Sequence, residues 1–182
     1  VEEAKRAKRF VHAHAESLEG YINAVEEGVE VLAHGMDLNQ DAISLSIEKD
    51  VTLVPTLTIA DIILKFGSSA GLPDWVLEKT KEVHEVHLNS VKKAYRAGVR
   101  IATGTDFFIG AKEVQIYGLN SLEIKLLHEL GMKSMDVLKA ATCNAAKATG
   151  LDGTTGSLQS GMLADVIVVD GDPLDDPRIL LD

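Results

Sequence analysis

The sequence contains a single cysteine, Cys143, among its 182 residues. One thiol cannot form an internal disulfide, and it rules out a metal cluster built from cysteines. Any metal that the chain binds must therefore be held by histidine, aspartate or glutamate side chains. The sequence also lacks a run of about 20 apolar residues, the length that a membrane-spanning helix needs.

Basic residues are in the minority, with 18 Lys and Arg against 28 Asp and Glu, which gives a net charge of -10. This charge argues against nucleic acid or an anionic membrane as the main partner. The chain begins with the charged, helix-like run Val1–Arg9, which is neither a signal peptide nor preceded by an initiating methionine. We therefore expect a cytoplasmic protein whose chain starts inside something longer, with a signal peptide upstream of Val1 left open.

The sequence does contain enough apolar material for a core, because 46% of its residues are hydrophobic. Its 182 residues suffice for one domain, whereas a complete eightfold β/α barrel takes about 250. The expected strands lie at residues 10–11, 29–33, 51–54, 99–102 and 164–169, and the expected helices at 16–27, 40–49, 74–97, 119–130 and 135–149. This alternation predicts βαβ units and a parallel sheet, which is an α/β fold.

Ligand-type side chains follow three of the expected strands. His12 follows the first strand, His34 the second and Asp106 the fourth. In a β/α barrel the active site lies at the C-terminal ends of the strands, and histidine with carboxylate suits zinc. Taken singly, each residue also fits a structural role, as a polar residue at the sheet rim or as a loop cap. The joint pattern favours a shared metal site.

Other histidines carry weaker signals. His84, Glu85 and His87 resemble the metalloprotease pattern His-Glu-x-x-His, but the second histidine would have to stand at position 88, which is Leu88. They lie within an expected helix among charged residues, so we predict that they occupy a solvated face. His128 on a later helix is also expected at the surface.

Several motifs together resemble the amidohydrolase superfamily. The runs that resemble the ends of its fifth to eighth strands are Val11–His14, Ala33–Gly35, Val54–Leu57 and Gly104–Asp106. Residues 140–147 and 156–166 are similar to the "ATxNxA" helix and the "GxlxxGxxAD" return strand of the same family. The combination covers nearly the whole chain and is most similar to the imidazolonepropionase and Xaa-Pro dipeptidase-like branch.

The resemblance implies a specific fold. Residues 1–150 would form the C-terminal half of a TIM-like (β/α)8 barrel, carrying strands five to eight. Residues 151–182 would form a turn-rich tail, ending in a strand that belongs to the family's small β-sandwich. The family's first-strand His-x-His and fourth-strand lysine are absent here, and we expect both upstream of Val1.

The resemblance also implies an activity: hydrolysis of a C–N bond in a small amide, a dipeptide or a cyclic amide. One or two divalent ions, usually zinc, would activate water. His12, His34 and Asp106 would bind metal, and Asp106 would also move the proton as general base and then acid. His14 would face the substrate or the oxyanion, although His12 and His14 could exchange roles. Tyr117 stands where many relatives have histidine, which makes it a candidate substrate contact.

Alternatives to this activity stay open. The chain could be a non-catalytic half-barrel assembly module or an inactive truncated homologue. It could also be a complete enzyme that uses three ligands only, since zinc catalysis commonly needs no more. As partners we expect the missing N-terminal half or a second copy of the chain, and as substrate loops residues 58–73 and 107–118.

Overall fold

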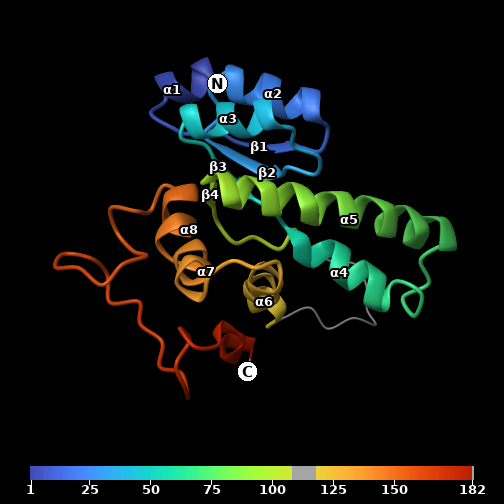
Figure 1. Ribbon diagram of the computed structural model, residues 1–182. Helices are drawn as coiled ribbons and strands as arrows, with labels where there is room; N and C mark the ends of the chain where they lie inside the picture. Colours follow the sequence, from blue (N-terminus) through green and yellow to red (C-terminus); the bar gives the residue numbers. More distant parts are fainter. Residues whose placement is uncertain (108–117, 182) are drawn as a thin grey trace.

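Four parallel strands form one sheet in the computed structural model of this chain, which describes residues 1–107 and 118–181 (Figure 1). The strands are β1 (His12–Ala15), β2 (Val31–His34), β3 (Thr52–Val54) and β4 (Arg100–Ile101). They are hydrogen-bonded in chain order, and each neighbouring pair is parallel. The predicted α/β fold with a parallel sheet is therefore confirmed.

Helices connect and cover the strands. The helices are α1 (Glu2–Arg6), α2 (Leu18–Glu26), α3 (Gln40–Glu48), α4 (Leu57–Phe66), α5 (Asp74–Ala97), α6 (Leu122–Glu129), α7 (Ser134–Ala141) and α8 (Cys143–Ala148), with 3-10 turns η1 (Leu119–Ser121) and η2 (Pro177–Leu181). Side chains that accept a backbone N–H start two of them, Ser17 at α2 and Asn39 at α3. No helix among the described residues is both long and apolar enough to cross a membrane.

The two faces of the sheet differ because side chains alternate along each strand. Leu32, Leu53 and Ile101 point toward the helices and join the main hydrophobic core. Their neighbours on the opposite face, Val31, Val54 and Ala102, form a smaller cluster with Ala148 of α8. On β1 the residues Ala13 and Ala15 pack against the main core, whereas His12 and His14 are exposed. This half barrel thus has a well-covered outer face and a sparsely covered inner face.

The stretch 58–73, expected to be irregular, begins with α4 instead. Thr56, the residue before this helix, has a left-handed backbone with φ 58° and its side chain makes no capping hydrogen bond. The first backbone N–H groups of α4 instead donate to the carboxylate of Glu123, which is distant in sequence. Local sequence patterns therefore hold no sign of where this helix begins.

The expected final strand, residues 164–169, is not formed in the structure. Val168 within it is 96% exposed, and Figure 1 shows the end of the chain as an open path below α7 and α8. A strand needs a neighbour to pair with, and among the described residues no strand runs beside this segment. The division into a barrel half (1–150) and a β-sandwich tail (151–182) stays a prediction.

Candidate active site

Three side chains converge where β1 and β2 end. One ligand atom from each of His14, Glu16 and His34 lies within 4.8 Å of the other two. The ring nitrogens His14 Nδ1 and His34 Nε2 are 2.6 Å apart, and His14 Nε2 lies 3.7 Å from Glu16 Oε1. Two imidazoles and a carboxylate form a donor set that suits a first-row divalent ion such as zinc.

The backbone at these strand ends is unusual. His34, Thr56 and Asp106 follow or end three adjacent strands, and their φ angles are 75°, 58° and 52°. Residues other than glycine in this left-handed region cost on the order of 1–3 kcal/mol each and tend to cluster at functional sites. The strained positions therefore mark the same edge of the sheet as the converging side chains.

The imidazole of His34 is held in one orientation and one tautomer. Thr56 Oγ1 donates its hydrogen to the carbonyl of Pro55 at 2.6 Å and lies 2.7 Å from His34 Nδ1. Because the hydroxyl has only one hydrogen, Nδ1–H of His34 must donate to it. The other nitrogen, Nε2, then presents its lone pair toward His14. A histidine that ligates a metal characteristically donates its second ring N–H to such a partner.

Helix α5 holds the backbone that follows β2. His87 Nε2–H donates to the carbonyl of His34 at 2.9 Å, and Ser90 Oγ donates to the carbonyl of Gly35 at 2.6 Å. Ser90 Oγ also accepts from the N–H of Leu38. His87 is only 2% exposed, so the predicted solvated position is wrong for this residue. The helix as a whole is rich in charged residues, but His87 lies on the face that also carries the buried Val91 and Ala94.

Burial and neighbouring charges set the protonation of these histidines. Burial lowers the pKa of His34, the charge of His14 lowers it further, and the carboxylates of Asp106 and Glu16 raise it. His12 is largely exposed, but partial burial of its ring lowers its pKa as well. Burial also lowers the pKa of His87 to about 4. Depressed pKa values keep imidazoles neutral near pH 7, the form that binds metal.

The residues expected at the site are brought together unequally. His34 is central. The sequence favours His12 as the second histidine ligand, whereas in the structure it is His14 that belongs to the converging group with His34. His12 lies two residues earlier on the same strand face. Asp106 lines a cavity with His34 and Glu16 but does not belong to the group within 4.8 Å. Tyr117 lies outside the described residues.

Glu16 is the residue that sequence reasoning missed. It stands in the alternation His12, His14, Glu16, which continues the inward-facing positions of β1 one step beyond its end. That spacing of two was visible in the sequence. The expected helix 16–27 includes Glu16, but in the structure this helix begins two residues later, at Leu18.

A cavity of 420 Å³ opens beside the converging side chains. Its walls come from α4 and α5 and are largely apolar, with Ile59, Ile63, Val76 and Val83 among the residues that line it. His34, Glu16 and Asp106 line one part of the cavity, and Lys79 and His84 line another. The geometry places an apolar compartment directly against the candidate metal ligands, as expected for a substrate site.

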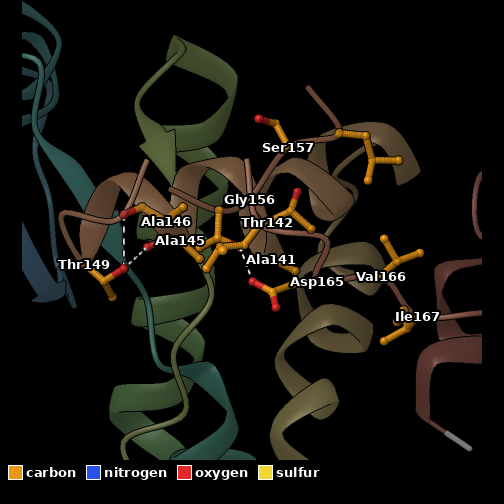
Figure 2. A pocket seen from close by; sticks show the side chains of 13 residues that line it. Ala141, Thr142, Ala145, Ala146, Thr149, Gly156, Ser157, Asp165, Val166 and Ile167 are labelled. Carbon is orange, nitrogen blue, oxygen red and sulfur yellow. Dashed lines mark hydrogen bonds between the residues drawn. The ribbon is translucent and has the colours of Figure 1, made fainter. Parts of the chain in front are cut away.

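A larger cavity of 740 Å³ lies elsewhere, between α7, α8 and the tail. Figure 2 shows residues of these helices, including Ala141 and Ala145, together with Asp165 and Val166 of the tail. Asp165 accepts a hydrogen bond from Thr155 at 2.8 Å. Among the described residues that line it there is no histidine and no pair of carboxylates, so its size alone does not make it an active site.

Glu123 of α6 is a fully buried carboxylate that contacts the start of α4. Its Oε1 accepts from the N–H of Leu57 at 3.0 Å, and its Oε2 accepts from the N–H and hydroxyl of Thr58 at 2.9 and 2.6 Å. Burial raises the pKa of Glu123 to about 7, although these hydrogen bonds act in the opposite direction.

Glu123 is expected to make the protein less stable as the pH rises from 4.5 to about 7. In this range the folded protein binds more protons than the unfolded chain, because the folded-state pKa is the higher one, so the free energy of unfolding falls. The fall should amount to about 1 to 3 kcal/mol. Urea unfolding at several pH values should show a flatter profile for Glu123→Gln than for the unmodified protein. If the free energy of unfolding depended on pH in the same way in both proteins, the pH effect would not come from Glu123.

Known proteins resemble this chain over nearly its whole length. The family model for the amidohydrolase family matches residues 1–182. Ochratoxinase from Aspergillus niger is 33% identical over 181 residues, covering 98% of this chain and 36% of its own. A crystal structure of a Xaa-Pro dipeptidase with bound methionine superposes with a TM-score of 0.85 at 32% identity, and covers 100% of this chain and 44% of its own.

A crystal structure of a prolidase bound to N-methylphosphonate-L-proline has a TM-score of 0.89 at 30% identity, and covers 100% of this chain and 43% of its own. The chain thus spans about two fifths of the length of the relatives that it matches, consistent with half of a TIM barrel. A full-length family match and these structural likenesses lead to one conclusion: the chain belongs to the amidohydrolase family.

Proposed function

We propose that this chain supplies one half of a metal-dependent amidohydrolase that cleaves a C–N bond in an amide, peptide or cyclic amide. The observation that carries the proposal is the meeting of His14 Nδ1 and His34 Nε2, 2.6 Å apart, at the C-terminal ends of parallel strands. The tautomer of His34 set by Thr56 supports it, because the nitrogen that carries the lone pair is then the one that faces His14, where it accepts a hydrogen bond in the metal-free protein.

His14, His34 and Glu16 fit a zinc ion by the chemistry of their donor atoms. When bound, the ion would lower the pKa of water toward neutrality and polarise the substrate carbonyl. Asp106, at the end of β4 and beside the same cavity, would take a proton from the attacking water and give it to the leaving amine. His12, on the same face of β1, would complete the ligand set or face the substrate.

The cavity beside the ligands favours a substrate with an apolar group next to the scissile bond. Its walls of isoleucine and valine side chains would bury that group, while Lys79 would offer a positive charge to a substrate carboxylate. The solved relatives include a dipeptidase and a prolidase, and both names describe enzymes that act on peptides. We therefore favour acylated amino acids and dipeptides as the substrate class.

The inner face of the sheet should be completed by further protein. Among the described residues, β1 and β4 each pair with one neighbour only, and exposed edges of this kind invite pairing. The occupant we propose is the remaining part of the barrel, from the same gene or a partner chain. Sedimentation velocity of the 182-residue chain should show self-association or aggregation. A monodisperse monomer would contradict this expectation.

The proposed function is tested by measuring zinc content and hydrolytic activity on the same preparations. The chain would be loaded with zinc, alone and together with the N-terminal half of the barrel, and assayed on N-acyl amino acids and dipeptides. We expect at least one equivalent of zinc and hydrolysis that a chelator abolishes. Less than about a tenth of an equivalent, with no hydrolysis in either preparation, would favour the non-catalytic assembly module instead.

A further inference from the structure

The carboxylate of Glu123 replaces a helix cap that the local sequence does not provide. The first N–H groups of a helix have no partner inside the helix, and a side chain just before it normally accepts one of them. At α4 the side chain of Thr56 makes no such bond. Glu123 accepts hydrogen bonds from the N–H groups of Leu57 and Thr58, which precede it by 66 and 65 residues.

Thr56 stands between this helix start and the candidate metal ligands. Its hydroxyl contacts His34 Nδ1 at 2.7 Å, so it is the group that selects the tautomer and the direction of the ring. Its backbone is left-handed, with φ 58°, which a threonine does not adopt without support. The two residues that follow Thr56 are those whose N–H groups Glu123 holds. Fixing Leu57 and Thr58 therefore fixes the backbone that aims the hydroxyl.

We propose that Glu123 is a positioning residue for the candidate metal centre: through the start of α4 and the hydroxyl of Thr56 it holds the ring of His34 with Nε2 free for metal. This proposal rests on the proposed function for its role in metal binding, but the orientation of His34 is a property of the metal-free protein. Glu123 itself belongs neither to the converging ligand group nor to the lining of the adjacent cavity.

A purely structural role for Glu123 would give a different pattern. Removing its carboxylate would leave buried N–H groups unpaired and lower stability in either case. Only a positioning role also changes the tautomer of His34. In addition, only a positioning role makes the effects of Glu123 and Thr56 on that ring overlap, because both then act through one chain of contacts.

The first test is nitrogen NMR of the histidine rings in the metal-free protein. In the unmodified chain His34 should be protonated at Nδ1. Glu123→Gln, which preserves volume, and Thr56→Val, which removes only the hydroxyl, should each shift His34 toward a mixture of tautomers. Thr149→Val is the matched control, because its hydroxyl bonds to the Ala145 carbonyl in α8, away from the site. It should leave His34 unchanged.

The second test is calorimetric titration with zinc alone. Each site variant should bind zinc about 10- to 100-fold more weakly, and the double variant no more weakly than the worse single one. Normal His34 protonation in Glu123→Gln, or a double variant whose losses multiply, would overturn the proposal. So would a metal-free protein in which His34 is not protonated at Nδ1. If the unmodified chain binds no zinc but the NMR pattern holds, the metal centre fails and the positioning role stands.

Discussion

His34→Ala is expected to lower zinc affinity by at least about a hundredfold and to abolish metal-dependent hydrolysis. Losing only the outer partner of a metal-binding histidine already costs about 10- to 100-fold, and here the ligand itself is lost. His34 also joins the other elements of the site, because its ring meets His14 and Thr56 while its carbonyl accepts from His87. No neighbouring histidine among the described residues occupies its strand end.

The measurement is zinc content after dialysis, followed by the hydrolysis assay with the complete barrel. His128→Ala is the matched control, since it removes a histidine on α6 that lies outside the converging group. That variant should keep the zinc and the activity of the unmodified protein. Retention of zinc by His34→Ala at the original affinity would place the metal elsewhere.

Leu32→Ala is expected to lower the free energy of unfolding by about 2–5 kcal/mol. Leu32 is fully buried at the centre of β2, and its side chain packs in the main core beneath the helices. Removing it eliminates apolar contacts and leaves a cavity that the central strand cannot collapse to fill. A loss of this size is a large part of the stability of a single domain.

Urea unfolding followed by circular dichroism would measure this change, with Leu158→Ala as the matched control. Leu158 lies in the tail and is 83% exposed, so the same substitution there should change the free energy by no more than about 0.5 kcal/mol. Similar losses in the two variants would mean that β2 is not the centre of the core.

The strands and the strand-end histidines could be predicted from sequence because their signals are local. Apolar segments such as Val51–Val54, separated by helical periods, predict a parallel sheet, and three of the expected strands overlap strands of the structure. The first expected strand is misplaced, because β1 covers His12–Ala15 rather than residues 10–11, so His12 begins the strand instead of following it. The position of His34 follows directly, since it ends a strand. Strand alternation likewise puts His12 and His14 on one face, but it does not say which of them is nearer to His34.

The supporting contacts could not be predicted because their causes lie far apart in the chain. His87 is 53 residues from His34. It shares a helix face with Val91 and Ala94, but that pattern does not say which strand end the face packs against. Glu123 likewise lies 66 residues along the chain from Leu57, the first residue of α4. The expected strand at 164–169 failed for a related reason, since strands depend on neighbours that a single segment does not contain.

The left-handed strand ends set a limit on how this protein could be made more robust. Glycine adopts positive φ without steric penalty, so replacing His34, Thr56 or Asp106 by glycine would relieve the backbone at each position. Selection for thermal tolerance alone would therefore favour glycine at three positions whose side chains the proposed metal site requires. The backbone and the proposed chemistry would thus make opposite demands at these three positions, and engineering for thermal tolerance should leave them unchanged.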